Sequence, residues 1–148
     1  MIWHGGTLPD LARATAFGAD SMPGFLGIEF VGVGDDWLRA RMPVDARTKQ
    51  PYGRLHGGAS VALAETLGSV AGAMTVDPER FAAVGLEINA NHVRPAGEGF
   101  VVATARPEAM GRTTQVWSIR IEDEGGKLVC ISRFTLAVIP RDRGAPSA

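Results

Sequence analysis

Residues 50–74 read QPYGRLHGGASVALAETLGSVAGAM, and the rest of the chain is organised around this stretch. It begins polar and turn-like, reaches His56-Gly57-Gly58, and is then almost wholly apolar, with Glu65 as its one later charge. The pattern predicts a buried helix that begins at the two glycines. Glu65 and Ser69 share one of its faces, because they are four residues apart. A lone carboxylate there has to be hydrogen-bonded, paired or beside water.

Small residues recur along the same predicted helix at Ala64, Gly68 and Gly72, each four positions after the last. Residues with this spacing form a ridge along which another backbone can approach closely. A glycine costs about 1 kcal/mol in a helix interior. Two of them therefore indicate that the helix is tightly packed against a neighbour.

The composition describes an ordinary globular chain. Its 148 residues, 45% of them hydrophobic, favour a single domain over residues 1–140, followed by a flexible tail at 141–148. A net charge of −1 gives no broad field to attract nucleic acid or a membrane. The single cysteine, Cys130, excludes an internal disulfide. With no signal pattern and no apolar run long enough for a bilayer, we expect a cytoplasmic protein.

Alternating apolar and polar residues predict several strands outside the central helix. Val84, Leu86, Ile88 and Ala90 are expected on the buried face of one of them. The predicted order is a helix at 8–17 with Pro9 in its first turn, a hairpin of 26–33 and 37–42, the central helix, and strands at 84–92, 100–106, 115–121 and 127–139. This order predicts an α+β fold in which one antiparallel sheet wraps around a single apolar helix, and its short late loops favour a meander.

The start of the central helix has the chemistry needed for acyl transfer. Amides at a helix N-terminus are unpaired and carry partial positive charge. Gly57 or Gly58 could therefore hold a carbonyl oxygen as it becomes an oxyanion. Glu65 could act as a nucleophile or as a general base on water.

Four sequence blocks, in order, resemble one known family. They are MPVDARTKQPYG at 42–53, the His-Gly-Gly helix, VGLEINANH at 84–92 and GRTTQVW at 111–117. Together they are similar to the hotdog-fold acyl-CoA thioesterases, in the branch of the phenylacetate and aryl-CoA enzymes. Within it they look most like the bacterial dihydroxynaphthoyl-CoA hydrolases of menaquinone synthesis and the proofreading thioesterases of enterobactin synthesis.

The resemblance implies a role for each residue of the central motif. Glu65 would be the nucleophile or general base, and the Gly57 amide would polarise the thioester carbonyl of an aromatic acyl-CoA. His56 would support that carbonyl, Gln50 would orient the acyl group, and Ser69 would position Glu65 or its water. In the family these parts meet across a dimer interface, so a dimer with shared sites is expected, paired into a tetramer.

The resemblance also implies which residues bind the substrate and its coenzyme A, which is the only cofactor-like group expected. Many relatives have a histidine shortly before the glycine of the second coenzyme A segment, where this chain has Glu108-Ala109-Met110-Gly111. The binding residues implied are Gly85, His92, Val93, Arg94, Pro95, Ala109, Met110, Gly111, Arg112, Thr113 and Thr114.

Other functions remain open at this level. A serine hydrolase could use Ser60 in Gly58-Ala59-Ser60-Val61-Ala62 as a degraded nucleophile elbow, although that motif needs a preceding strand. A hotdog domain that binds acyl-CoA without turnover, and a thioesterase for medium or long fatty acyl-CoA, are the closer alternatives. His56, Glu65 and His92 lack a metal-ligand spacing, so no metal site is expected.

Overall fold

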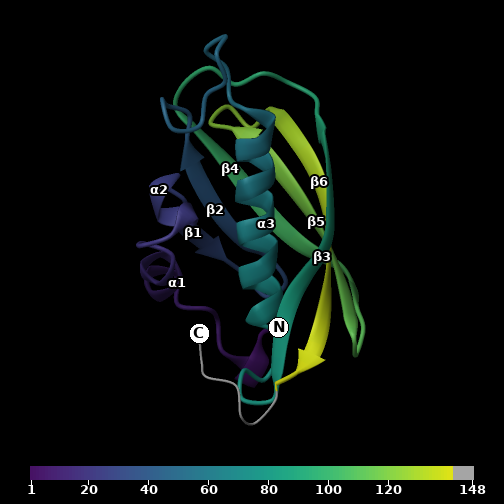
Figure 1. The fold of residues 1–148 in the computed structure, drawn as a ribbon. Helices are drawn as coiled ribbons and strands as arrows, with labels where there is room; N and C mark the ends of the chain where they lie inside the picture. The colour runs from purple at the N-terminus through teal and green to yellow at the C-terminus, as the bar shows by residue number, and fades with distance from the viewer. Residues whose placement is uncertain (142–148) are drawn as a thin grey trace.

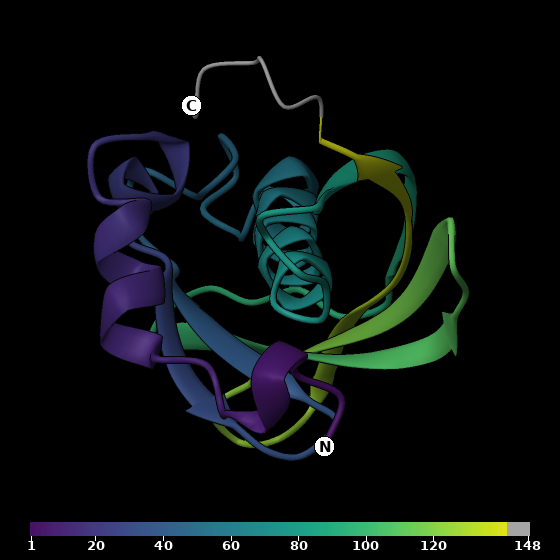
Figure 2. The same ribbon diagram turned by 90° about the horizontal axis from the view of Figure 1, so that it is seen from below.

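The computed structural model describes residues 1–141 as one curved antiparallel sheet wrapped around a central helix. Figure 1 shows the helix lying lengthwise on the sheet, and in Figure 2 the strands curve around it. The hotdog fold expected from the sequence is confirmed. The flexible tail predicted at 141–148 lies outside the described residues except for Arg141, whose amide donates to the Arg80 carbonyl at 2.9 Å.

The six strands lie in the order β1-β2-β4-β5-β6-β3, so β4, β5 and β6 form the expected meander and β3 pairs with the last strand. A short 3-10 turn, His4–Gly6, precedes the first helix. The helices are α1 (Leu11–Phe17), α2 (Met22–Phe25) and α3 (Gly57–Ala73), and the strands are β1 (Glu29–Val33), β2 (Leu38–Pro43), β3 (Phe81–His92), β4 (Phe100–Met110), β5 (Thr114–Asp123) and β6 (Leu128–Pro140).

Alternation along the inner strands places one face of the sheet against α3. In β5, where a strand was predicted at 115–121, the buried residues are Gln115, Trp117, Ile119 and Ile121. The indole N–H of Trp117 donates to the Gln115 side-chain oxygen at 3.0 Å, so the largest core side chain also has its polar atom satisfied.

Helix α3 lies so close to β6 that only glycine fits at two of its positions. A Cβ atom added to Gly68 would lie 2.5 Å from the ring of Phe134, and one added to Gly72 would lie 2.3 Å from Leu136. Both neighbours are buried and cannot move aside. The ridge of small residues predicted from the sequence is therefore the contact between helix and sheet.

The N-terminal helix begins later than predicted. It starts at Leu11, because the Asp10 carboxylate accepts the Arg13 amide at 3.0 Å and caps the first turn, which leaves Pro9 outside. The predicted strand at 26–33 begins only at Glu29. Residues 26–28 instead connect it to α2, a short helix that was not expected from the sequence.

The face predicted for β3 is wrong over its first half. Val84 is 39% exposed and Leu86 is 62% exposed, whereas Gly85 faces α3. The cause is a bulge between Gly85 and Glu87, where the pairing with β6 shifts by one residue. A bulge reverses the alternation, so Ile88 and Ala90, beyond it, do pack against the core as expected.

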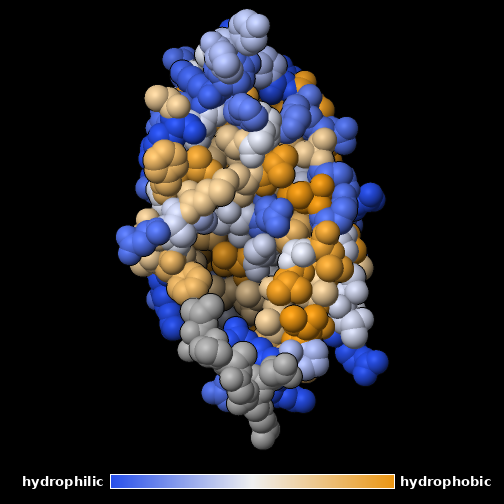
Figure 3. Space-filling view, viewed as in Figure 1, coloured by the Kyte–Doolittle hydropathy of each residue, from blue (hydrophilic) through white to orange (hydrophobic). Residues whose placement is uncertain are grey.

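Apolar surface gathers on two sides of the molecule (Figure 3). One patch lies over β3, a 12-residue edge strand, and the other over α1 and α2, where Phe17, Met22 and Phe25 are exposed. The opposite edge strand, β1, is short and contacts α1. Within the described residues, no helix is long and apolar enough to cross a membrane.

We expect Gly68→Ala to destabilise the fold although alanine is the better helix former. The added methyl would overpack Phe134, which costs roughly 1–3 kcal/mol and outweighs a helix gain of about 1 kcal/mol. Urea denaturation at fixed protein concentration measures the change. Gly58→Ala is the control, because its Cβ would meet only the His56 ring, at 3.0 Å. A higher urea midpoint for Gly68→Ala than for the wild type would contradict the close packing.

Candidate active site

The loop before α3 is built by hydrogen bonds that hold Gln50 in place. The Gln50 amide donates to the Arg54 carbonyl at 2.8 Å, and the Tyr52 amide donates to the Gln50 side-chain oxygen. That leaves the side-chain NH₂ of Gln50 as a donor. Before this turn, Arg47 bonds to Asp45 and holds the pKa of that carboxyl below its usual value.

His56 caps α3 and decides which glycine amide is left for a ligand. Its Nδ1 accepts the Gly58 amide at 2.8 Å, so a neutral ring carries its proton on Nε2. The Gly57 amide has no acceptor among residues 1–141. Of the two glycines considered from the sequence, Gly57 is therefore the one with a free helix N-terminal donor.

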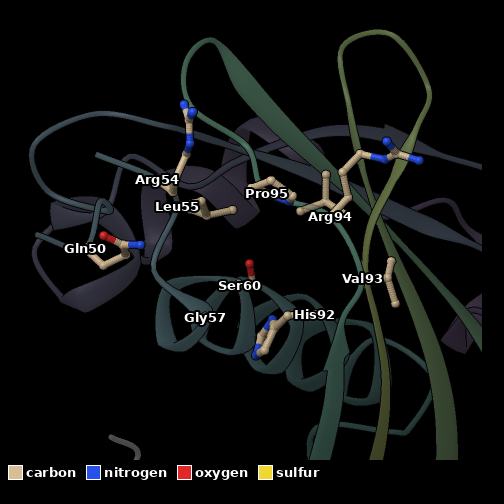
Figure 4. Close-up of a pocket in the computed structure, with 10 residues that line it drawn as sticks. Gln50, Arg54, Leu55, Gly57, Ser60, His92, Val93, Arg94 and Pro95 are labelled. Carbon is tan, nitrogen blue, oxygen red and sulfur yellow. The ribbon is translucent and has the colours of Figure 1, made fainter. Parts of the chain in front are cut away.

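A cavity of about 400 Å³ opens beside this free amide. It brings together Gln50, Gly57 and the predicted binding segment from His92 to Pro95, and its other walls are Arg54, Leu55, Ser60 and Val129. Figure 4 shows His92 beside the start of α3, while the two arginine side chains extend outward from the rim. A Cβ on Gly57 would lie 2.8 Å from His92 Nε2, so glycine is needed for this approach.

Glu65 and Ser69 line a second cavity, of about 320 Å³, between α3 and the N-terminal helices. They share a face as predicted. The Glu65 carboxylate reaches β3, because its Oε1 would lie 2.9 Å from a Cβ placed on Gly85. It forms no ion pair within residues 1–141. The remaining walls come from α1, α2, β1 and α3, and include Thr15, Phe17, Pro23, Ile28, Phe30, Thr66 and Val70.

The predicted site residues therefore fall into two groups in one chain. Gly57 and Glu65 are eight positions apart in the helix, which is about 12 Å along its axis. A carbonyl bound at the Gly57 amide is too far from the Glu65 carboxylate of the same chain for attack, since reacting atoms must lie about 3–3.5 Å apart.

The second predicted coenzyme A segment joins neither cavity. Ala109 and Met110 end β4, Thr114 begins β5, and the turn between them is exposed. This hairpin tip lies toward the C-terminal end of α3, whereas the cavity with Gly57 lies at the N-terminal end (Figure 1). Residues 92–95 and 109–114 are thus not brought together within one chain.

Comparison with known proteins identifies the family. Residues 52–130 match the thioesterase superfamily. The chain is 55% identical over 139 residues to the 1,4-dihydroxy-2-naphthoyl-CoA hydrolase of Escherichia coli, covering 94% of this chain and 100% of that protein. It is 47% identical to the proofreading thioesterase EntH of Cronobacter turicensis, covering 94% and 99%.

The chain belongs to the thioesterase superfamily. Among solved structures, a mutant thioesterase from Pseudomonas aeruginosa superposes with a TM-score of 0.92 at 48% identity, covering 95% of this chain and 100% of that one. The family resemblance expected from the four sequence blocks is confirmed.

Several residues that line the cavities of this thioesterase were not expected from the sequence. They are Arg54 in the first cavity and Thr15 and Phe17 in the second; Ser60, in the first, was considered only as the nucleophile of a serine hydrolase. Ser60 follows Gly57 by three positions, a helical spacing that could have placed it on the same face. No local pattern marks Thr15 and Phe17, because α1 reaches the cavity only through tertiary packing.

Two other side chains could in principle act as nucleophiles: Cys130, which lies apart from both cavities, and Ser60, which lines the first one. Cys130 is buried in β6, and burial raises the pKa of its thiol, so it is a poor nucleophile. Ser60 lies inside α3 and not at a strand-to-helix turn, so the nucleophile elbow is absent there. Across residues 1–141, no group of three His, Cys, Asp or Glu side chains could hold a metal ion.

We expect Gly85→Ala to lower kcat of the thioesterase roughly 10- to 10²-fold, the scale of a small misplacement of a catalytic group. The new methyl would lie 2.9 Å from Glu65 Oε1 and 3.1 Å from Phe134, and the carboxylate is the part that can move. Steady-state thioester hydrolysis beside a thermal melt separates activity from stability. Gly125→Ala, in the distant β5–β6 turn, is the control. Equal kcat for both variants would show that activity does not depend on the position of the Glu65 carboxylate against Gly85.

Proposed function

We propose that this thioesterase hydrolyses an aromatic acyl-CoA, of the dihydroxynaphthoyl or benzoyl type, to the free acid and coenzyme A. Glu65 supplies the attacking oxygen, directly or through a water molecule. The Gly57 amide polarises the thioester carbonyl, His56 supports it through Nε2–H, and the Gln50 side-chain NH₂ orients the acyl group. Ser69, which lines the cavity with Glu65, positions the carboxylate or its water.

The observation that carries this proposal is the way the two halves of the site lie along β3. Gly85, in its first half, touches Glu65, and His92, at its end, touches Gly57. Edge strands that pair in an antiparallel way place the first half of one beside the end of the other. Two copies joined through β3 would therefore bring Glu65 of each chain toward Gly57 of the other.

The free edge of β3 is a second reason to propose a partner chain. It is a long edge strand with the exposed apolar side chains Val84 and Leu86. Such an edge is prone to pair with another chain unless it is covered. We therefore propose an obligate dimer through β3, in which the hairpin tip at 109–114 of one copy also comes toward the His92 end of the other. Two such dimers form the proposed tetramer.

The two cavities differ in the part of the substrate that they suit. The first has Arg54 and Arg94 at its rim, cations that can bind the phosphates of coenzyme A. The second has the buried Ile28 and Phe30 in its inner wall and Phe17 at its exposed side, and its volume suits a compact aromatic ring. Its hydroxyl groups can bond to ring substituents.

The E. coli relative named for dihydroxynaphthoyl-CoA supports a place in menaquinone synthesis, which we propose for this chain. We also propose that the protein is cytoplasmic and uses no cofactor beyond the coenzyme A of its substrate.

The substrate class is tested by kcat/KM across a panel of thioesters. We expect dihydroxynaphthoyl-CoA and benzoyl-CoA to exceed octanoyl-CoA and palmitoyl-CoA at least 10-fold, because a ring fills the second cavity better than an extended chain. Activity should survive dialysis against a chelator, since the proposed chemistry uses no metal. A preference for fatty acyl chains would assign the chain to the alternative substrate class. Binding of all thioesters without turnover would make it a binding domain.

The shared site is tested with two inactive variants. Glu65→Gln keeps shape but removes the basic carboxylate, so kcat should fall at least about 10²-fold. Gln50→Ala removes a group from the other half of the site. When the two chains are unfolded, mixed in equal amounts and refolded, mixed dimers carry one intact site, and about a quarter of wild-type activity should return.

Each variant refolded alone is the control for that mixture. A mixture no more active than its components would mean that each site lies within one chain. A fully active monomer in analytical ultracentrifugation at assay concentration would also contradict the shared site.

A further inference from the structure

Ser60 is a buried hydroxyl that points into the cavity beside Gly57. The residue is only 1% exposed. Every fully enclosed side-chain oxygen or nitrogen among residues 1–141 has a hydrogen-bond partner. The Ser60 hydroxyl bonds to none of the described residues, so it is not fully enclosed. Its small exposed surface faces the cavity that Ser60 lines. Figure 4 shows its oxygen directed from α3 into the space between Leu55, Pro95 and His92.

Helix geometry brings this hydroxyl toward the free amide of Gly57. Residues three apart share a helix face and are about 4.5 Å apart along the axis. Helical side chains also point back toward the N-terminus, so the Ser60 oxygen lies nearer to Gly57 than its Cα does. The cavity thus contains two neighbouring donors, the Gly57 N–H and the Ser60 O–H, that lack acceptors among the described residues. A carbonyl oxygen can accept from both, because it has two lone pairs.

We infer that Ser60 is a catalytic residue whose hydroxyl is a further donor to the thioester oxygen, in addition to the Gly57 amide and the His56 Nε2–H. This rests on the proposed function. An oxygen of Glu65 or of water bonds to the thioester carbon, and the carbonyl electron pair moves onto the oxygen held by Gly57 and Ser60. When that pair returns, the carbon–sulfur bond breaks and coenzyme A leaves as a thiolate. If water attacks, the thiolate takes up the proton that Glu65 removed from the water; if Glu65 attacks, the thiolate takes up a proton from solvent, and water then hydrolyses the Glu65–acyl anhydride to the free acid. Ser60 keeps its own proton throughout.

Kinetics separate this role from the alternatives. Ser60→Ala should lower kcat for benzoyl-CoA roughly 10²-fold, the scale of one lost oxyanion donor, with KM nearly unchanged. Binding of a CoA thioether, which lacks the carbonyl, should also be unchanged. Ser60→Cys, close in volume but a weak donor, should fall between Ser60→Ala and the wild type. Ser118→Ala, on β5 away from both cavities, is the matched control and should keep full activity.

A spectroscopic measurement reports directly on the carbonyl. In Glu65→Gln, turnover is slow enough to record the carbonyl stretch of bound ¹³C-labelled benzoyl-CoA by difference infrared spectroscopy. We expect this frequency to lie below its value in solution and to move part of the way back when Ser60→Ala is added. Adding Ser118→Ala should leave it where it was.

The possible failures are distinguishable. A raised KM with unchanged kcat and carbonyl frequency in Ser60→Ala would place the hydroxyl on the coenzyme A arm and overturn the assignment. An acyl-serine intermediate, seen as a burst that Ser60→Ala abolishes, would make Ser60 the nucleophile and also overturn it. If the wild type hydrolyses no aromatic thioester, the proposed function fails and the Ser60 role fails with it. A normal wild type with an unchanged Ser60→Ala variant overturns the Ser60 role alone.

Discussion

The contact between α3 and β6 is the constraint on which the rest of the structure depends. Gly68 and Gly72 have no side chains, so Phe134 and Leu136 lie directly against the helix backbone. This contact fixes the height of the helix above the sheet and its rotation about its own axis. Because of this rotation, Glu65 and Ser69 face the N-terminal helices, and the start of the helix faces β3. Packing in the core thus decides where the reactive groups point.

Strand β3 contacts both halves of the site and shows how far apart they lie in one chain. It contacts the carboxylate through Gly85 and the helix N-terminus through His92, at two well-separated places along its length. Glycine is used at both contacts, once on the strand and once on the helix, because a methyl group would occupy the space of the functional atom. The bulge after Gly85 lets this residue face the helix while the strand beyond it keeps Ile88 and Ala90 in the core.

The sequence alone predicted the elements whose patterns are local. The central helix, its start at Gly57 and the existence of strand β5 could be derived because helical spacing and strand alternation are visible in the local sequence. The exposure of Val84 and Leu86 could not be derived from the sequence. It results from a bulge, which depends on the pairing register between β3 and β6, more than forty residues further along the chain. The same limit applies to the site. Gly57 and Glu65 carry a recognisable pattern, whereas the cavity walls from α1 and α2 depend on how distant elements pack.

The strand order has a consequence for how the chain reaches its folded state. Within the sheet, β3 has only β6 as a neighbour, and β6 is the last strand of the described chain. During synthesis β3 and the adjoining face of α3 must wait for that strand, with their apolar residues uncovered in the meantime. Long-range pairing of this kind slows folding and exposes surfaces that aggregate. A ribosome-bound chain that ends before Leu128 would lack the strand that covers Gly68 and Gly72, so truncation there removes the core contact itself and not merely the end of the sheet.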